Sequence, residues 1–431
     1  MLFQSVIFLS FFSVLLLFLR VVKNSKIQKS AVLLFSLYAY SQFSMLLALT
    51  ISMSALACFI LSKGEFKKWK LAISIIFQIG IFTYFKLNSN FTETNALVVF
   101  GVSFFTMQAI AYSVDVYKKK LPPQTILNVF LYLTYYPQLV AGPIIRPKNF
   151  FSQITSPFMV NRNTIAEGFS YLSIGLFLKL VISNNIAPAV VSRMSFDGES
   201  YNIVFWLINF TQFAIYIYAD FAGYSLMAIG LAKSMGIDLP TNFNFPFIAK
   251  SFSEYWQRWH ISLTEFFRDY IFFPTWIKKP NYIVAITLTF VVSGLWHGLE
   301  SIFILWGIVH ALLLIFERYT NVTKLPIFLR LPFTQFFVIL TLGLFGCNST
   351  EQFYEILTNP NISQSVLAYF GKFELFFIPI FFGAHYIFST SRFKDTVNSN
   401  KFNSKYLLVT SAWIAILFFR GAGKQYAYFN F

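Results

Sequence analysis

Ser251-Phe-Ser-Glu-Tyr-Trp-Gln-Arg-Trp-His260-Ile-Ser-Leu-Thr-Glu-Phe-Phe-Arg-Asp-Tyr270 and Ser293-Gly-Leu-Trp-His297-Gly298 are the two stretches that decide how this chain folds. They contain two of the only four histidines in 431 residues. The first stretch is rich in charged and indole side chains, whereas the second lies in an apolar run. Because an ionisable side chain is costly in a membrane-like segment, both histidines are candidates for a functional role.

The first stretch has the periodicity of an amphipathic helix. Ser251 and Glu254 fit a capping box, in which both side chains satisfy free N–H groups at a helix start. Apolar residues and His260 then recur at spacings of three and four through Phe267, with the charges largely on other faces. The pattern predicts one helix that lies on or dips into a membrane interface but is too charged to span a bilayer. An interfacial helix that is anchored by tryptophans and carries no chemistry fits the same pattern.

The composition predicts an integral membrane protein. Hydrophobic residues make up 57% of the chain and charged residues 12%, whereas a soluble domain has about 25% charged residues. The formal net charge is +16, and the cations cluster in short loops beside apolar runs, as in the positive-inside pattern. The expected partner of these charges is therefore the lipid bilayer and not a nucleic acid.

The apolar runs predict an all-α fold with about eleven transmembrane helices, at about 20 residues per crossing. The run 31–62 is too long for one crossing and predicts a helical hairpin that turns near Ser41 to Ser44. With this hairpin, the basic loops around Lys26, Lys67 and Lys119 fall on one side, which we expect to be cytoplasmic. One domain over residues 1–431 is expected, with its core at 96–320. The runs are 2–22, 31–62, 71–87, 96–117, 165–190, 203–233, 281–299, 301–317, 331–347, 366–390 and 405–420.

Two segments depart from simple apolar helices. Residues 126–150 contain four helix-breaking residues, Pro137, Gly142, Pro143 and Pro147. They predict either a re-entrant loop packed in protein or a kinked helix end with a cytoplasmic turn. The second segment is the run 203–233, where Asp220 needs a partner because a lone carboxylate is costly in an apolar environment. Arg258 and Arg146 are the expected cations, and Asp220 could be a purely structural member of such an ion pair.

Several catalytic classes have no motif in the sequence. It contains no G-x-S-x-G nucleophile elbow, no phosphate-binding G-x-x-x-x-G-K-[ST] and no H-E-x-x-H. Two cysteines and scattered histidines do not form a metal signature. We therefore expect no metal and no bound cofactor. A neutral imidazole in a dry site is a good general base, although His297 could equally be a hydrogen-bonded structural group.

Short motifs are spread along most of the chain. They are Gly101-Val-Ser-Phe-Phe-Thr-Met-Gln-Ala-Ile, Pro137-Gln-Leu-Val-Ala-Gly-Pro-Ile-Ile-Arg-Pro, Gly175-Leu-Phe-Leu-Lys179, Asn242-Phe-Asn-Phe-Pro, Trp256-Gln-Arg-Trp-His260-Ile-Ser-Leu, Phe267-Arg-Asp-Tyr270, Gly294-Leu-Trp-His297-Gly298 and Tyr428-Phe-Asn-Phe. These motifs resemble the membrane-bound O-acyltransferase family, and most of them look like the membrane subunit of alginate O-acetyltransferase. Phe221-Ala-Gly-Tyr-Ser-Leu226 looks more like the teichoic-acid D-alanyl transferase branch.

The resemblance implies a multi-helix membrane fold with re-entrant and interfacial helices around a central funnel. It implies His297 as the catalytic histidine and His260 at the second family position, which many eukaryotic members fill with Asn. An oxyanion donor would be His260 or Arg258, and His297 would act as a base or carry the acyl group transiently. The residues expected to bind the donor or support the site are Arg258, Trp296, Trp256, Trp259, Asp269, Asp220, Tyr224 and Arg146.

The expected function is O-acylation of an extracytoplasmic cell-envelope polysaccharide from the bacterial inner membrane. The donor would be a cytoplasmic thioester, acetyl-CoA or an acyl carrier protein, and the acyl group is expected to be acetyl. The partner would be the polysaccharide itself or a periplasmic acyltransferase. D-alanyl transfer to a teichoic-acid-like polymer and a non-catalytic acyl-export subunit remain alternatives. A transporter is disfavoured because the Pro-rich loop has no counterpart in the second half.

Overall fold

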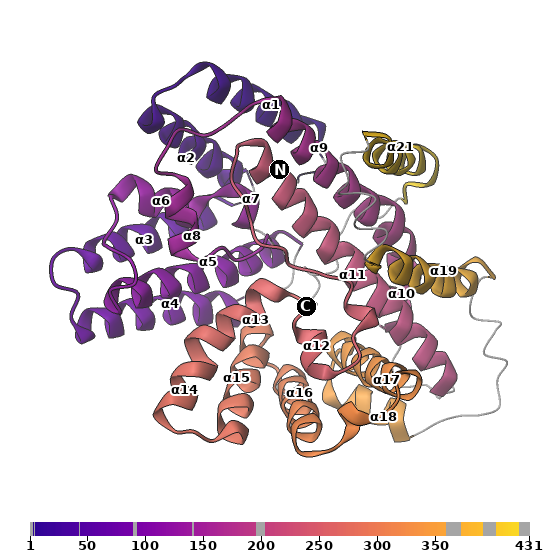
Figure 1. Ribbon diagram of the computed structural model, residues 1–431. Coiled ribbons are helices and arrows are strands. Elements are labelled where there is room, and N and C mark those ends of the chain that lie inside the picture. Colours follow the sequence, from indigo (N-terminus) through magenta and orange to yellow (C-terminus); the bar gives the residue numbers. More distant parts are fainter. Residues whose placement is uncertain are drawn as a thin grey trace. The chain divides into compact units, whose positions relative to one another are not determined.

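A computed structural model of the chain describes residue 3 and residues 5–42, 44–88, 93–139, 142–194, 203–358, 372–390 and 402–421. Every regular element in these ranges is helical, as the apolar runs predict (Figure 1). Residue contacts divide the chain into two compact units, one built from 1–176 and 224–241 and the other from 177–223 and 242–429. The long helix α11, Ile203–Ser234, begins in the second unit and ends in the first.

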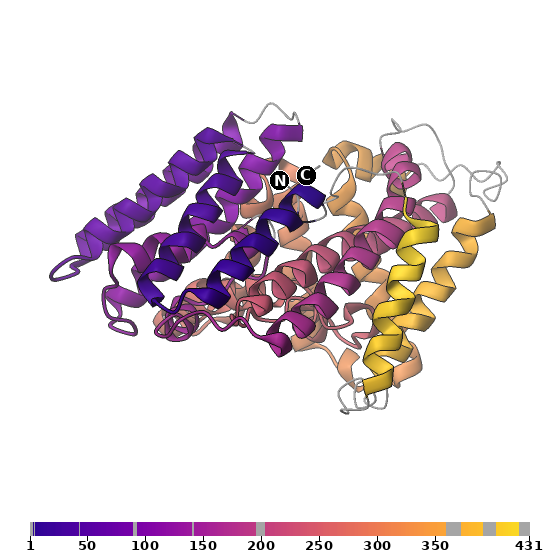
Figure 2. The ribbon, with the colours of Figure 1, turned by 90° about the horizontal axis from the view of Figure 1, so that it is seen from above.

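The first unit is built on a series of helices joined by short turns. The predicted hairpin in 31–62 is confirmed, because α2 ends at Ser41 and the Ser44 hydroxyl caps α3 by accepting the Leu47 N–H at 3.3 Å. Neighbouring helices of this group run side by side (Figure 2). Which side of a membrane their basic turns face stays a prediction. The helices are α1 (Val6–Val21), α2 (Ser25–Ser41), α3 (Met45–Ser62), α4 (Lys68–Leu87), α5 (Glu93–Tyr117) and α9 (Arg162–Phe177).

The Pro-rich segment of the first unit is broken into short helices, as its prolines predict. These are α6 (Ile126–Thr134), α7 (Tyr136–Leu139) and α8 (Pro147–Gln153), and residues 140–141 lie outside the described ranges. The segment is packed in protein: the Tyr132 hydroxyl donates to the Ile145 carbonyl at 3.0 Å, and both residues are buried. This burial suits irregular backbone at membrane depth, but the depth itself stays a prediction.

The second unit holds the remaining helices. A π-helical turn, Leu178–Ser183, leads into α10 (Asn184–Met194). After the first part of α11, a loop and two short helices, α12 (Phe252–Trp256) and α13 (Ile261–Phe267), precede the longer helices. The rest of the unit consists of α14 (Phe273–Lys278), α15 (Tyr282–His297), α16 (Ser301–Tyr319), α17 (Ile327–Gly346), α18 (Thr350–Thr358), α19 (Lys372–Ser389) and α21 (Phe402–Phe419).

Helices α15 and α16 pack against each other unusually closely. A Cβ on Gly294 would lie 2.3 Å from the Phe303 carbonyl oxygen, and a Cβ on Gly307 would lie 2.3 Å from the Phe290 carbonyl oxygen. Only glycine fits at either position, so each helix offers a smooth patch to the other. This reciprocal contact brings α16 against the end of α15 that carries His297.

The chain is a multi-pass membrane protein by the length and hydropathy of its helices. Six helical segments among the described residues are long and apolar enough to cross a bilayer, and four shorter apolar helices accompany them. The number of about eleven crossings and the central funnel stay predictions. The six segments are Met45–Ser62, Lys68–Leu87, Arg162–Met194, Ile203–Ser234, Ser301–Tyr319 and Ile327–Gly346.

Candidate active site

The helix expected around His260 is broken at that residue. Ser251 caps α12 as predicted by accepting the Glu254 N–H at 3.0 Å, but Glu254 accepts the Lys250 N–H and so does not complete the capping box. Helix α12 ends at Trp256, α13 begins at Ile261, and His260 between them has a left-handed backbone with φ of 42°. The prediction of one continuous helix is therefore wrong at its centre.

A strand-like segment after α11 causes the break. The Asn242 carbonyl accepts the Ile261 N–H at 2.9 Å, and the Asn244 N–H donates to the Arg258 carbonyl at 2.9 Å. These bonds replace the helical hydrogen bonds on both sides of His260. The residue is only 2% exposed, and Trp256 and Trp259 are also buried. The aromatic side of this stretch therefore packs inside the unit, which does not fit an interfacial helix with lipid-facing tryptophan anchors.

Asn242 fixes the orientation and the tautomer of His260. Its side-chain oxygen accepts the Ser262 N–H at 3.3 Å and the Ser262 hydroxyl at 2.9 Å, so this atom is the amide oxygen. The same oxygen lies 3.1 Å from His260 Nδ1, which must then carry the proton. His260 lies outside the candidate spans, and burial lowers its pKa to about 3. The neutral ring thus presents the lone pair of Nε2.

His297 has a different setting at the end of α15. It is the last residue of the helix, followed by Gly298, and it is half-buried. Its ring makes edge contacts with Trp306 at 5.1 Å and Phe345 at 4.9 Å between ring centroids. The ring of the preceding residue, Trp296, lies 4.7 Å away between centroids. His297 lies at the C-terminal end of α15, where the negative end of the helix dipole favours a positively charged side chain.

Both histidines line one small cavity inside the second unit. Its volume is about 20 Å³, which is room for one or two water molecules. The structure therefore brings together His260, His297, Trp256 and Trp259 of the predicted site. Trp296 is not among the cavity-lining residues but touches the rings of both histidines, His260 at 6.2 Å between centroids. The cavity is completed by Ile217, Tyr255, Leu263, Trp306, Leu342 and Phe345.

None of the four charged residues predicted for the site lines this cavity. The Arg258 guanidinium bonds Glu254 through Nε and Nη2 at 2.9 and 2.8 Å and donates to the Asn244 carbonyl at 2.9 Å. Asp269 pairs with Arg268 at 2.9 Å near the surface. Arg258 thus holds α12 to the segment that bonds His260, which is a supporting position.

Asp220 has a cation as predicted, and the cation that the structure describes is Lys179, which was not among the expected partners. Lys179 Nζ lies 2.5 Å from Asp220 Oδ1, and the Ser183 hydroxyl donates to the same oxygen at 3.0 Å. Both charged side chains are fully buried, at 0% and 1% exposed. Of the two expected cations, Arg258 is bound to Glu254, and the pairing with Arg146 stays a prediction. Tyr224 and Arg146 belong to the first unit, where Tyr224 stacks on Phe3 at 4.6 Å and Arg146 precedes α8.

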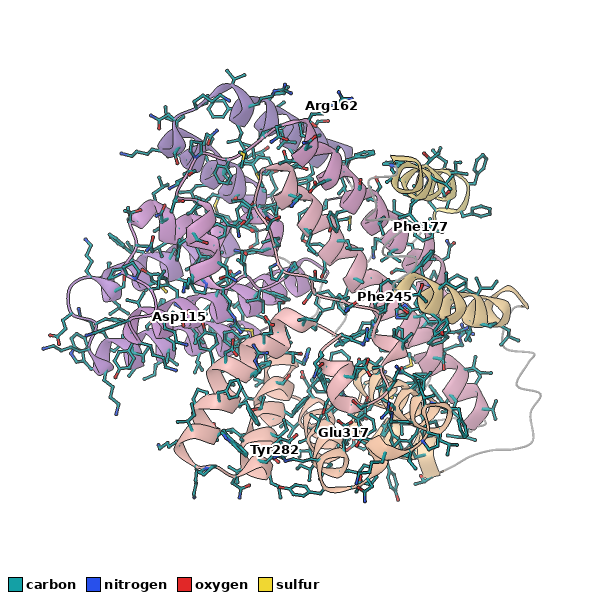
Figure 3. The ribbon with its side chains drawn as sticks, viewed as in Figure 1. Asp115, Arg162, Phe177, Phe245, Tyr282 and Glu317 are labelled. Atoms are coloured by element: carbon teal, nitrogen blue, oxygen red, sulfur yellow. The ribbon has the colours of Figure 1, made fainter. Side chains whose placement is uncertain are left out.

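Three residues of α16 that are not among the predicted site residues belong to its surroundings. Trp306 lines the cavity, and His310 packs against Trp256 and Trp306 at 4.9 and 4.7 Å between centroids. Glu317, which Figure 3 labels, lies further along α16. The Glu317 carboxylate accepts the Phe252 N–H at 2.5 Å and the Ser253 N–H at 3.2 Å. Trp306, His310 and Glu317 are four and seven positions apart, and these spacings in an apolar helix indicate that the three residues share one face.

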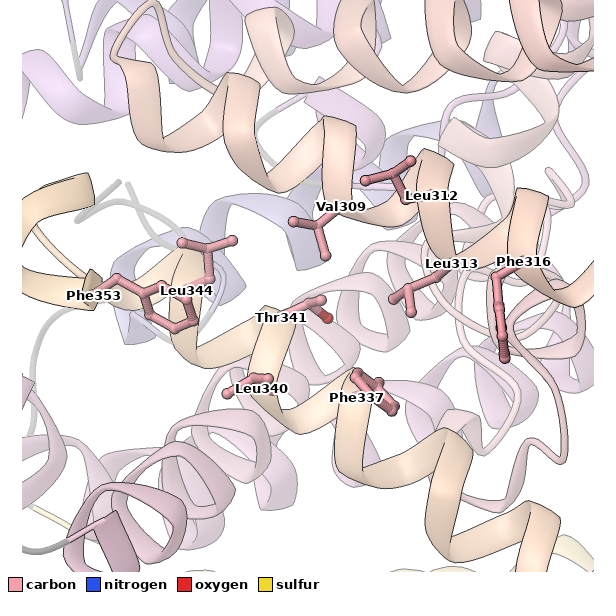
Figure 4. A pocket seen from close by; sticks show the side chains of 9 residues that line it. All are labelled: Val309, Leu312, Leu313, Phe316, Phe337, Leu340, Thr341, Leu344 and Phe353. Atoms are coloured by element: carbon pink, nitrogen blue, oxygen red, sulfur yellow. The ribbon is translucent and has the colours of Figure 1, made fainter. Parts of the chain in front are cut away.

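A larger hollow of about 290 Å³ lies elsewhere in the second unit, between α16, α17 and α18 (Figure 4). Its walls are apolar side chains such as Val309, Phe316, Phe337 and Leu344, and Thr341 is the one polar residue among them. It contains no titratable group. The smaller cavity is therefore the candidate active site, because it alone of the two holds side chains that can move a proton.

Comparison with known sequences places these residues in a family. The sequence profile of the membrane-bound O-acyltransferase family, MBOAT, matches residues 32–341, which include both histidines. The chain belongs to this family. Relatives similar to it are named for peptidoglycan, alginate and teichoic acid.

Three such relatives illustrate the range. Peptidoglycan O-acetyltransferase of Helicobacter pylori is 29% identical over 305 residues, covering 61% of this chain and 58% of the relative. The probable alginate O-acetylase AlgI of Pseudomonas aeruginosa is 30% identical over 283 residues, covering 60% and 53%. Teichoic acid D-alanyltransferase of Bacillus subtilis is 29% identical over 248 residues, covering 53% and 62%. The chain thus matches little more than half the length of these relatives.

Proposed function

We propose that the chain is an O-acyltransferase that moves an acetyl group from a cytoplasmic thioester across the bacterial inner membrane for O-acylation of an extracytoplasmic envelope polysaccharide. Membership of an acyltransferase family supports the reaction class, and relatives named for peptidoglycan and alginate support the acceptor class. The observation that carries the proposal is the cavity that His260 and His297 line together. Acetyl-CoA and an acyl carrier protein are both suitable donors.

His297 is the residue that handles the proton. Being half-buried at a helix end, it meets substrate more readily than the fully buried His260. It takes the proton from the attacking hydroxyl, and the helix C-terminus stabilises the charge that the ring then carries. Attack by the imidazole itself, with a transient acyl-histidine, uses the same geometry. His260, neutral and held by Asn242, accepts a hydrogen bond at Nε2 and orients the hydroxyl or the ring of His297.

The cavity lining favours acetyl over D-alanyl. A D-alanyl group carries an ammonium ion, and burying a cation is costly unless an anion pairs with it. None of the ten residues that line the cavity is Asp or Glu. D-alanyl transfer remains the second candidate, because indole faces such as those of Trp256 and Trp259 can bind an ammonium group and because D-alanyltransferases are among the relatives.

The test is acyl transfer by the purified protein in lipid nanodiscs, with labelled acetyl-CoA as the probe. His297→Ala should abolish acyl transfer, because a positioned proton-transfer group contributes about 10²–10⁴-fold. His385→Gln is the matched control, since His385 is buried in the same unit but does not line the cavity. Wild-type turnover by His297→Ala would refute the proposal. Turnover of a D-alanyl carrier-protein thioester in preference to acetyl-CoA would favour the second candidate. Absence of transfer by the wild-type protein until a partner enzyme is added would favour an acyl-export subunit.

A further inference from the structure

Acyl transfer needs hydrogen-bond donors that neither His260 nor Arg258 supplies. When a nucleophile attacks a thioester, the carbonyl oxygen becomes negative, and donors aimed at it contribute strongly to the rate. The Nδ1 proton of His260 is directed to Asn242, so the ring offers a lone pair to the cavity and not a donor. The Arg258 guanidinium is bound to Glu254 and to the Asn244 carbonyl. The donor has to come from other cavity-lining side chains.

Two indole N–H groups meet this requirement. Trp256 on α12 and Trp306 on α16 both line the cavity, and they are only 8% and 4% exposed. Their ring centroids are 5.8 Å apart. Within the described part of the chain, neither buried Nε1 has an acceptor. A buried donor left without an acceptor costs about 1–3 kcal/mol, so two of them at one small cavity indicate a site built to receive an oxygen atom.

We propose that the indole N–H groups of Trp256 and Trp306 form the oxyanion site, which binds the carbonyl oxygen of the acyl thioester. The inference rests on the proposed function and names the groups that bind the donor. The attacking oxygen forms a bond to the carbonyl carbon, its proton moves to His297, and the carbonyl π electrons move onto the oxygen held by the two indoles. Collapse then breaks the C–S bond, and the thiolate takes the proton from His297.

The surrounding contacts fix the spacing of the two donors. His310 packs edge-on against both indoles, at 4.9 Å from Trp256 and 4.7 Å from Trp306. Glu317, on the same helix as Trp306, binds the first backbone N–H groups of α12 and so anchors the helix that carries Trp256. The two donors come from different helices, and these contacts make them one rigid group. His310 is thus a positioning residue, behind the indoles and outside the cavity lining.

The size of the cavity agrees with this role. A volume of about 20 Å³ accommodates one or two water-sized groups, which suits a carbonyl oxygen. The apolar walls formed by Leu342 and Phe345 exclude bulk water, and a low local dielectric strengthens the hydrogen bonds that the indoles make.

The experiment replaces each indole by a ring without an N–H group. Trp256→Phe and Trp306→Phe keep an aromatic side chain, and Trp206→Phe is the matched control, since Trp206 is 2% exposed in the same unit but does not line the cavity. Purified proteins are assayed in nanodiscs with acetyl-CoA, and kcat and KM are measured separately. Loss of one oxyanion donor should lower kcat on the order of 10²–10³-fold with little change in KM, while Trp206→Phe should keep wild-type kcat.

Other outcomes would overturn the inference without touching the proposed function. If His297→Ala is inactive but both phenylalanine variants keep wild-type kcat, the indoles are not donors to the reacting oxygen. A rise in KM at unchanged kcat would assign them to substrate binding only, and an equal loss in Trp206→Phe would make the effect one of packing. Where a phenylalanine variant does not fold, benzothienylalanine at the same position removes the N–H group with almost no change of shape, and wild-type kcat there would equally overturn the inference.

Discussion

Replacing one member of the Lys179–Asp220 ion pair should destabilise the protein more than replacing both. The two side chains are 0% and 1% exposed, with Nζ and Oδ1 2.5 Å apart. Lys179→Met leaves a buried carboxylate without its cation, although the Ser183 hydroxyl still donates to it, and Asp220→Leu leaves a buried ammonium group. An uncompensated buried charge costs about 3–5 kcal/mol, whereas replacing a whole buried pair by apolar side chains is often neutral or stabilising.

The assay is unfolding of the detergent-solubilised protein, followed for both single variants and for the double variant Lys179→Met/Asp220→Leu. Both single variants should have clearly lower unfolding free energies than the wild type, and the double variant should recover most of the loss. The surface pair Lys67–Glu65 provides the control, since its side chains are 58% and 80% exposed. Lys67→Met should change stability by less than about 1 kcal/mol.

Activity separates a structural role of Asp220 from a chemical one. Neither Lys179 nor Asp220 lines the cavity that holds the two histidines, so the folded double variant should retain acyl transfer. Single variants as stable as the wild type would refute the reasoning about buried charge. A stable but inactive double variant would refute the structural assignment and place Asp220 in the chemistry.

Two further predictions concern the supports of the site. Asn242→Leu should lower kcat/KM by up to about tenfold, because it removes the acceptor that holds the His260 tautomer at 3.1 Å, and one hydrogen bond is worth about 0.5–1.5 kcal/mol. Asn242→Asp keeps an acceptor and should be milder. Equal losses in steady-state assays of the two variants would contradict this. Glu317→Ala should lower the unfolding free energy by about 3 kcal/mol or more, since two charge-assisted hydrogen bonds to α12 are lost, whereas Glu317→Gln keeps one acceptor and should recover part of the loss; unchanged denaturant midpoints would contradict it.

Local sequence signals were sufficient for the helical framework. Runs of apolar residues predicted the helices of both units. The hairpin near Ser41 to Ser44 could be predicted because the apolar run is too long for one crossing, and the structure confirms it. The Ser251 cap could be predicted because it depends on residues three positions apart, and the structure confirms it. His297 and its glycine neighbours could be read from one short apolar motif. These features are determined by residues close together in the sequence.

Features that depend on distant residues could not be read in this way. The break at His260 is made by Asn242 and Asn244, which lie outside the helix periodicity and contact it only after the loop folds back. Lys179, which pairs with Asp220, is 41 positions away on a π-helical turn. Because this lysine stands inside an apolar run, the sequence pattern did not mark it as a partner. The face of α16 that carries Trp306 was readable as a pattern, but its direction toward the cavity was not.

The backbone of His260 is strained, and the same contacts that hold it in this conformation fix the position of the imidazole. A left-handed backbone costs an L-residue roughly 1–2 kcal/mol, and such strain persists only where surrounding contacts over-determine it. Here the contacts are the backbone bonds from Asn242 and Asn244 and the side-chain bond from Asn242. In a continuous helix, His260 and Trp256 would lie on the same face, because they are four positions apart. The break instead separates the two, so that the indole reaches α16 while the imidazole stays tied to the loop, and both still line one cavity with His297. Histidine tolerates this backbone conformation better than most residues, which is a physical reason for a histidine to stand at this position.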